Sequence, residues 1–296
     1  MADILIGPAG WSYADWKGIV YPSRRPKGFR EPAFLSQFFD VIEINTSFYQ
    51  PLKPQMCREW LAQVAGNTRF VYTAKLWRKF THEGAFEAKD VEEVRAGYDV
   101  LAGAGRLGAL LLQFPFSFHR TPENMRRLRD LEKSFCEYPL VVEVRHSSWL
   151  DESFFEWLRE HNVGFCNIDQ PIIGRSIEPT EHATSSVAYV RLHGRRYDTW
   201  FDDDPDSPPS ERYNYLYSAE ELEPWAQRIR KASEGAKTTY VIANNHFEAK
   251  GIVNSLELMH LLFGEKVKVP EELRHHYPRL EQIASAPSKE PTLFPV

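Results

Sequence analysis

Ionisable residues occur inside or at the end of several short apolar runs in this sequence. Glu43 lies in "VIEIN" and Glu143 lies in "LVVEVR". Two carboxylates that face one site can act as general acid and general base, or can flank a glycosidic bond. Histidine is the other side chain that carries protons near neutral pH, and it ends "VAYVRLH" and lies in "FTHEG". We therefore predict that the catalytic residues are Glu43, Glu143, His193 and His82.

Cations follow the same pattern and indicate an anionic ligand. Lys75, Arg145 and Arg191 each lie at the polar end of an apolar run. Ammonium and guanidinium groups bind phosphate and carboxylate, and nearby amide and aromatic side chains could complete a polar pocket. The predicted substrate-binding residues are Asn45, Tyr49, Lys75, Gln113, Arg145, Asp169, Arg191, Asn244, Asn245, Trp11 and Tyr13.

Alternation within the apolar runs supports one shared site. Side chains on a strand point alternately to its two faces, so Ile42 and Ile44 share one face of "VIEIN", and Glu43 and Asn45 share the other. The same alternation in five further runs gives one mostly apolar face and one face that turns polar toward its end. In a barrel the apolar face would meet helices, and the polar residues would converge in the lumen at the carboxyl ends of the strands.

A purely structural explanation of these residues competes with the functional one. Glu43 with Lys75, or Glu143 with Arg191, could be ion pairs whose only role is to satisfy each other. Buried ion pairs add little stability compared with apolar packing. A whole ring of them at one end of a barrel is more simply explained by a ligand.

Eight apolar runs alternate with helical or loop segments and read as strands. They are 4–7, 41–45, 70–75, 109–114, 140–145, 164–169, 187–193 and 240–245. Continuous apolar runs are typical of parallel strands covered by helices. Eight such units in 296 residues predict a single-domain α/β (β/α)8 TIM barrel over 1–277, with 278–296 as a C-terminal extension or tail. A doubly wound open sheet is the alternative, but no GxGxxG follows the first strand and no GxxxxGK[ST] occurs.

Capping residues mark several of the predicted helices. Thr121 is followed by Pro122, which is the expected order of an N-cap and a first helical residue. Ser218 and Glu221 form a capping-box pattern, although Pro224 suggests that the helix proper begins near that proline. Residues 194–217 form a long connection after the seventh strand, for which a lid or rim and a surface excursion are both open readings.

Bulk composition narrows the classes of function. The formal net charge is −5 and the sequence pI is about 6.1, which counts against a general nucleic-acid binder. No apolar run is long enough to span a bilayer and the beginning of the chain lacks a signal-peptide pattern, so a cytoplasmic location is expected and no membrane partner.

Seven motifs in a fixed order resemble the DUF72, or YecE-like, proteins. They are "GWSYADWKGIVYP", "VIEINTSFYQ", "FTHEG", "LLLQFP", "VEVRHSSW", "VRLHGR" and "IANNH". The resemblance runs from about residue 4 to about residue 265 and implies a TIM barrel of unestablished activity. That family has been compared with endonuclease IV, whose three zinc ions need many His and carboxylate ligands. Here cations are interleaved with the candidate ligands and would repel clustered metal ions, so a multi-metal site is not expected. No metal-ligating residue and no cofactor are predicted, and the binding of a single metal ion stays open.

Three hypotheses follow for the function. The first is a metal-independent enzyme, a hydrolase, lyase or isomerase, that acts on a small polar anionic substrate at the carboxyl-terminal mouth of the barrel. The second is a module that binds or processes nucleic acid on an endonuclease IV-like barrel, with aromatic faces stacking on bases. The third is a binding protein without catalysis. The sequence leaves the oligomeric state open.

Overall fold

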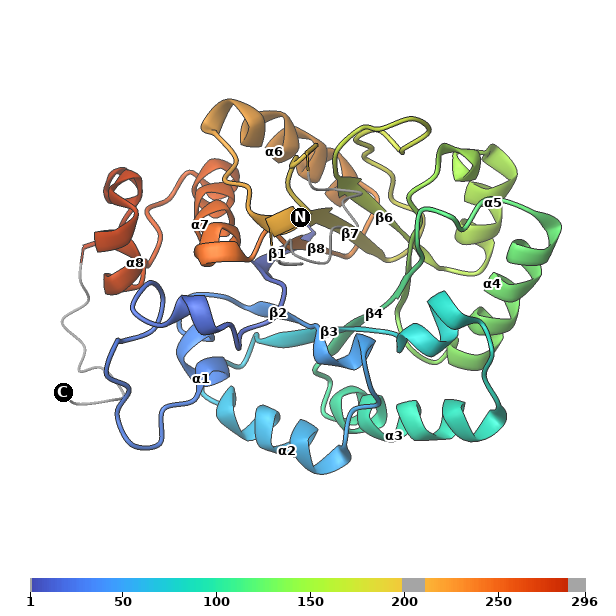
Figure 1. Ribbon diagram of the computed structural model, residues 1–296, viewed down its shortest axis with the longest axis horizontal. Coiled ribbons are helices and arrows are strands. Elements are labelled where there is room, and N and C mark those ends of the chain that lie inside the picture. Colours follow the sequence, from blue (N-terminus) through green and yellow to red (C-terminus); the bar gives the residue numbers. More distant parts are fainter. Residues whose placement is uncertain (1, 199–210, 287–296) are drawn as a thin grey trace.

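The protein is a single α/β barrel. The computed structural model describes residues 2–198 and 211–286, and its eight strands form one parallel sheet in the order β1-β8-β7-β6-β5-β4-β3-β2, ringed by helices (Figure 1). The strands are β1 (Asp3–Pro8), β2 (Val41–Ile44), β3 (Val71–Lys75), β4 (Leu107–Gln113), β5 (Leu140–Glu143), β6 (Gly164–Asp169), β7 (Val187–Leu192) and β8 (Thr238–Ala243). The eight predicted strands and the TIM-barrel class are confirmed.

Most helices lie between consecutive strands and cover the outside of the barrel, whereas the last two follow β8, and residues 170–186, between β6 and β7, contain no helix (Figure 1). They are α1 (Glu31–Leu35), α2 (Pro54–Gln63), α3 (Ala88–Gly103), α4 (Pro122–Phe135), α5 (Glu152–Glu160), α6 (Ala219–Glu234), α7 (Lys250–Phe263) and α8 (Glu271–His276).

Predicted capping residues begin two of these helices. The Thr121 hydroxyl accepts a hydrogen bond from the backbone N–H of Asn124 at the start of α4, and Ser218 forms the predicted capping box at α6. The prediction that α6 begins near Pro224 was wrong, because the helix starts at Ala219 and contains the proline. The capping box fixes the first turn before the missing N–H of Pro224 is reached.

The barrel closes where β1 meets β2. In place of a full ladder, the backbone N–H of Gly10 donates to the Glu43 carbonyl at 2.8 Å, and Ala9 forms an isolated bridge with Glu43. A Cβ atom on Gly7 would lie 1.9 Å from the Val41 carbonyl oxygen, so only glycine permits this approach of the two strands. The backbone of Glu43 is thereby held at the seam of the barrel.

Two apolar layers surround the strands. An inner cluster fills the lumen and includes Val41, Leu111, Val141 and Tyr189. Side chains of the other parity, such as Ile42 and Ile44, belong to the larger cluster between the strands and the helices. This is the alternation that the sequence predicted for β2, and it directs Glu43 into the lumen.

The two predicted irregular segments are only partly within the described residues. The connection from β7 to α6 contains a short 3-10 turn at Glu211–Tyr213, while its acidic run lies in 199–210, outside the described residues. Of the predicted C-terminal extension, residues 278–286 are described, and Leu280 and Ile283 pack into the outer core. Its last ten residues, 287–296, lie outside the described residues.

Within the described part of the chain, no helix has the length and apolar character needed to cross a membrane.

Candidate functional site

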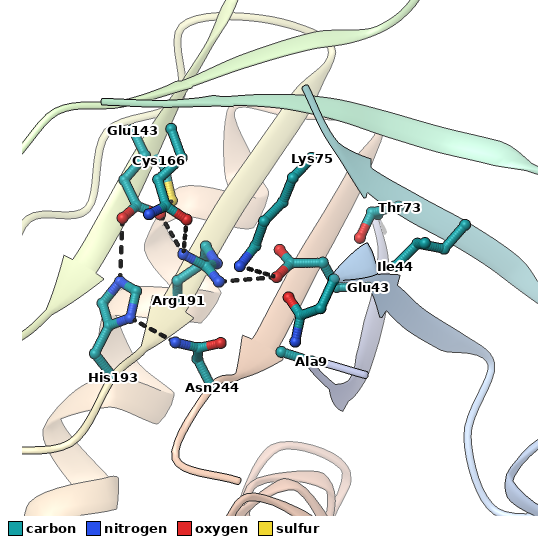
Figure 2. Close-up of polar contacts among 12 residues, drawn as sticks. Ala9, Glu43, Ile44, Thr73, Lys75, Glu143, Cys166, Arg191, His193 and Asn244 are labelled. Atoms are coloured by element: carbon teal, nitrogen blue, oxygen red, sulfur yellow. Dashed lines mark hydrogen bonds and ion pairs between the residues drawn. The ribbon is translucent and has the colours of Figure 1, made fainter. Parts of the chain in front are cut away.

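A buried guanidinium joins two carboxylates across the lumen of the barrel. Arg191 from β7 donates through Nη2 to Glu43 Oε1 at 2.8 Å and through Nη1 to Glu143 Oε2 at 2.5 Å (Figure 2). All three side chains have 0% exposure. The carboxylates come from β2 and β5, which are not neighbours of β7 in the sheet, so the arginine compensates two buried charges at once.

Glu43 has a second cation and a hydroxyl among its neighbours. Lys75 Nζ lies 3.5 Å from Glu43 Oε1, the oxygen that Arg191 also contacts (Figure 2). The Tyr189 hydroxyl donates to Glu43 Oε2 at 3.0 Å and lies 2.8 Å from the Thr73 hydroxyl. Glu43 therefore has its predicted partner Lys75 and a closer second cation, Arg191.

Glu143 is more fully surrounded by donors. Arg145 donates to Glu143 Oε1 at 2.8 Å, and His193 Nε2 lies 3.3 Å from the same oxygen. Arg191 occupies Oε2 and also donates to Gln113 Oε1 at 3.2 Å. Burial alone would raise the pKa of Glu143, but Arg191, His193 and Arg145 together hold it well below its ordinary value.

The hydrogen bonds of His193 define its protonation state. Asn244 Nδ2 lies 3.0 Å from His193 Nδ1 and can donate to it only if that nitrogen is unprotonated. The proton then resides on Nε2, which faces Glu143 Oε1. Burial lowers the pKa of His193 to about 3, so the ring is neutral at pH 7 and is a weak base.

Among the cations of the network, Lys75 loses its proton most easily near neutral pH. Burial and the nearby Arg191 charge lower the pKa of its ammonium to about 8, although Glu43 and Glu143 oppose the shift. For Arg191, burial favours the neutral form, but the two carboxylates outweigh it and raise the pKa well above normal. Arg191 is thus a permanent cation, whereas Lys75 can lose its proton.

The network has a closed floor and a more open upper layer. Glu43, Glu143, Arg191 and His193 are all fully buried. Above them, the side chains of Lys75 and Arg145 are 10% and 15% exposed, and Gln113 is partly exposed. A small molecule at the carboxyl-terminal mouth would therefore meet this upper layer first.

His82 lies in a turn of π-helix (Lys79–Glu83) beyond β3, beside the mouth. Its ring packs edge-on against Phe48 with centroids 5.0 Å apart, and burial together with the charges of Arg78 and Arg145 lowers its pKa to about 4. Gly84 ends this turn with φ +76°, and a Cβ there would lie 2.9 Å from Arg127 Cζ. The "FTHEG" motif thus positions His82 near cations that favour its neutral form.

The predicted lumen position of Asp169 was wrong. On β6 the lumen face carries Cys166 and Ile168, so Asp169 and Asn167 point outward. Asp169 accepts hydrogen bonds from Arg195 at 2.9 Å and from the Tyr217 hydroxyl. Its burial is explained by these loop residues, which the sequence of β6 alone does not indicate.

Asn245 and Trp11 also lie outside the lumen network. The Asn245 amide donates to the backbone of Tyr215 and to Asn254 on α7, so Asn244 is the lumen residue of this pair. Trp11 packs edge-on against Trp60 of α2 with ring centroids 5.0 Å apart. Neither side chain takes part in the ion network, and the binding role of both residues stays a prediction.

The remaining predicted residues lie around the mouth with mixed contacts. Tyr13 donates to the Ala9 carbonyl, accepts from Asn45 at 2.9 Å and stacks on His246. Tyr49 is 67% exposed and has no place in the ion network. Tyr13 and Asn45 thus form one side of the rim, and Tyr49 lies outside the network.

Sequence reasoning missed two hydroxyl residues beside Glu43: Tyr189 donates to its carboxylate, and Thr73 accepts from the Tyr189 hydroxyl. Tyr189 lies on the same face of its strand as Arg191, and Thr73 lies on the same face as Lys75. This alternation was the signal that could have identified them. Both were overlooked because hydroxyl side chains on a strand are ordinary lumen residues. Cys166 is a third case, since its Sγ lies 4.0 Å from Glu143 Oε2.

Two further observations bear on ligands. Among residues 2–198 and 211–286, no group of three or more His, Cys, Asp or Glu side chains could hold a metal ion. A cavity of about 740 Å3 lies at the amino-terminal end of β1, between 36–40 and 259–268, which is away from the ion network. We base the candidate site on the network because the cavity contains none of its residues.

Comparisons with known proteins give a consistent result. The family model described as "Protein of unknown function DUF72" matches residues 5–279. The UPF0759 protein YunF of Bacillus subtilis is 26% identical over 276 residues, which cover 88% of this chain and 94% of that protein.

Two solved structures are also similar. A DUF72 family protein of Thermotoga maritima has a TM-score of 0.76 and 31% identity, covering 88% of this chain and 99% of that one. One of Enterococcus faecalis has a TM-score of 0.74 and 21% identity, covering 88% and 95%, which speaks for the fold alone.

Proposed function

This chain belongs to the DUF72 family, whose function is unknown, and from that premise we propose that it is an enzyme for a small anionic substrate. The substrate would bind at the carboxyl-terminal mouth of the barrel, and the chain's own side chains would move a proton to or from it. The observation that carries the proposal is the charge of the lumen network. Among the described residues, the network brings together three cations, Lys75, Arg145 and Arg191, and two carboxylates, Glu43 and Glu143, and Lys75 and Arg145 are its more exposed cations.

A cation in a largely buried site is costly, and its cost can be lowered in two ways. An anion can bind beside Lys75 and Arg145, or Lys75 can release its proton. A phosphate or carboxylate at the mouth would satisfy the first and would meet guanidinium donors of suitable geometry.

The same contacts suggest a division of roles. Glu143 has donors on both oxygens and a low pKa, and His193 is a weak base, so both are suited to holding the network in place. Lys75 and Glu43 are the better candidates for proton transfer, because the pKa of Lys75 is about 8 and its contact to Glu43 is long, at 3.5 Å. Arg145 is the candidate anion-binding residue.

A binding protein without catalysis is the second candidate. The specific observation in its favour is that Glu43, Glu143, Arg191 and His193 have 0% exposure and contact one another. Such a network could serve only to fix the cations that receive an anion. The two candidates share the anion site and differ in whether the bound molecule is converted.

The experiment measures thermal stability and calorimetric binding with inorganic phosphate, sulfate and small carboxylates. We expect at least one anion to stabilise the wild type, and Arg145→Met to weaken its binding about tenfold or more. Arg159→Met is the matched control, because that arginine is on α5 and its side chain is 48% exposed. Absence of stabilisation by every anion tested would refute the proposal.

Turnover separates the two candidates. Metabolite pools incubated with wild type and with Glu43→Gln would be compared by mass spectrometry. Conversion that Glu43→Gln reduces by at least about a hundredfold supports the enzyme. Anion binding with equal pools in both samples favours the binding protein.

A further inference from the structure

The amine of Lys75 is held loosely inside an otherwise well-bonded network. Its contact with Glu43 Oε1 is 3.5 Å, whereas Arg191 contacts the same oxygen at 2.8 Å. The other oxygen of Glu43 accepts from Tyr189. Among the described residues, no second carboxylate lies within 4.0 Å of Lys75 Nζ. Glu43 is thus satisfied largely without the lysine.

The backbone of Lys75, in contrast, is fixed. Its N–H donates to Ser47 Oγ at 3.0 Å, and its carbonyl accepts from the Tyr98 hydroxyl at 2.8 Å. The side chain runs from this anchor into the lumen toward Glu43 and Arg191 (Figure 2), and Nζ lies 5.8 Å from the centre of the Phe48 ring. Lys75 is 8% exposed, so its side chain is confined in the lumen but keeps a small exposed surface.

The chemical state of this amine differs from that of a surface lysine. With its pKa lowered to about 8 by burial and by Arg191, roughly a tenth of Lys75 is unprotonated at pH 7. An ordinary lysine is unprotonated to well under a thousandth at that pH. A desolvated lysine beside another cation is a recognised arrangement for an activated amine nucleophile.

We propose that Lys75 forms an imine with a carbonyl substrate that also carries a phosphate or carboxylate group. This names the substrate class of the proposed anion site and rests on that function. Arg145 would bind the anionic group, and the confined amine would meet the carbonyl carbon. Glu43, next to Nζ, would accept or return the protons that the steps require.

The step balances without any further reactant. The free amine of Lys75 adds its lone pair to the carbonyl carbon, and the carbonyl oxygen gains the proton that nitrogen loses. The resulting carbinolamine then expels that oxygen as water with a second proton from nitrogen, which leaves a carbon–nitrogen double bond. The imine withdraws electrons from the neighbouring carbon, so a bond to hydrogen or carbon at that position becomes easier to break.

Reductive trapping on the full-length wild type tests the inference. The protein is incubated at pH 7 with glyoxylate and cyanoborohydride, which reduces an imine to a stable secondary amine, and the modified lysines are identified by peptide mass spectrometry. Lys79, whose ammonium hydrogen-bonds Asp90 at 2.7 Å, and the exposed Lys53 are internal controls. We expect Lys75 to be modified at least about tenfold faster than both, because far more of it is unprotonated.

A parallel experiment with uncharged glycolaldehyde separates this inference from the anion site. Preferential labelling of Lys75 by glyoxylate, weakened by Arg145→Met, supports both. Equal preference for the two aldehydes, with no effect of Arg145→Met, would support the imine and overturn the anionic part. If glyoxylate stabilises the protein but labels Lys75 no faster than Lys53, the imine is overturned and the anion site stands.

Discussion

Arg191 and Glu43 are 148 positions apart in the sequence, yet Arg191 Nη2 and Glu43 Oε1 lie 2.8 Å apart in the lumen of the barrel. The contact joins β7 to β2, and the other nitrogen of the same guanidinium reaches Glu143 on β5 at 2.5 Å. Three strands that are not neighbours in the sheet are therefore linked by one side chain. Both carboxylates depend on it for compensation of their charge.

Removal of this guanidinium should destabilise the fold. Arg191→Met leaves two carboxylates in the lumen with only Lys75 and Arg145 nearby, and we expect a loss of about 3–5 kcal/mol in the free energy of unfolding. Urea unfolding measures it. The exposed pair of Arg159 with Glu152 is the control, and Arg159→Met should change stability by less than about 0.5 kcal/mol.

The same defect should be relieved in part by removing one stranded charge. Adding Glu143→Gln to Arg191→Met should recover part of the lost stability, because it removes one buried carboxylate that has lost its guanidinium while Lys75 keeps Glu43 as its partner. If this double variant is less stable than Arg191→Met alone, Glu143 is stabilised by something other than the guanidinium of Arg191.

Lys75 should make stability depend on pH in the alkaline range. Its folded pKa of about 8 is below the unfolded value, so between about pH 8 and 10.5 the unfolded chain binds more protons than the folded one. The stability of the wild type relative to Lys75→Met should therefore rise with pH across this window, by up to about 3 kcal/mol. Urea unfolding of both proteins from pH 7 to pH 10 tests this, and a constant difference would show that Lys75 keeps an ordinary pKa.

His193 should stay neutral throughout the physiological range. Its pKa of about 3 is below the unfolded value near 6.5, so the stability it contributes is complete above that value and is lost as pH falls toward 3. Nitrogen NMR of labelled histidine should show a proton on Nε2, an unprotonated Nδ1 and no titration between pH 5 and 8. A midpoint near 6.5 would contradict the contacts with Glu143 and Asn244.

Strand positions and the lumen face of most strands could be predicted from the sequence. The apolar runs are short and are bounded by polar or glycine-containing segments. In most of them apolar and polar side chains alternate toward the end of the run, so only one of the two faces can pack against the helices. The alternation failed on β6, where Cys166 and Ile168 fill the lumen and Asp169 points outward. Every residue of β6 is buried on both faces, so polarity did not indicate which face was inside.

The partners of individual site residues could be predicted only where charge restricted them. Glu43 needed a cation, and the sequence offered Lys75 and Arg191 on nearby lumen faces. Asp169 also needed one, but its partner Arg195 comes from the connection after β7, whose path the sequence does not define. Loop geometry depends on tertiary packing, so contacts made by loops were the ones that sequence reasoning missed.

The seam between β1 and β2 should be intolerant of any side chain at Gly7. A Cβ there would lie 1.9 Å from the Val41 carbonyl oxygen, which is backbone and cannot rotate away. Gly7→Ala should therefore cost about 2–3 kcal/mol of stability or more, as measured by urea unfolding. Gly66→Ala is the matched control, since a Cβ on Gly66 would point into open space, and it should be close to neutral.

Asp169 provides a test of which acidic residues belong to the site. Its carboxylate accepts from Arg195 and from Tyr217 on the outer face of β6, so Asp169→Asn should lower stability by about 1–3 kcal/mol through the weakened hydrogen bonds. Anion affinity and the rate of glyoxylate trapping on Lys75 should stay within about twofold of wild type, because the lumen charges are unchanged. Calorimetry and peptide mapping measure the two quantities.

Glu143→Gln is the matched comparison for Asp169→Asn, since it neutralises a carboxylate that lies inside the network. This change removes one negative charge from the lumen, so it should strengthen anion binding. It should also lower the pKa of Lys75 further, and trapping at pH 7 should then be faster. Asp169→Asn could instead change the anion affinity and the trapping rate as much as Glu143→Gln does. In that case the charge of Asp169 acts on ligands at the mouth of the barrel, and its outward position does not exclude it from the site.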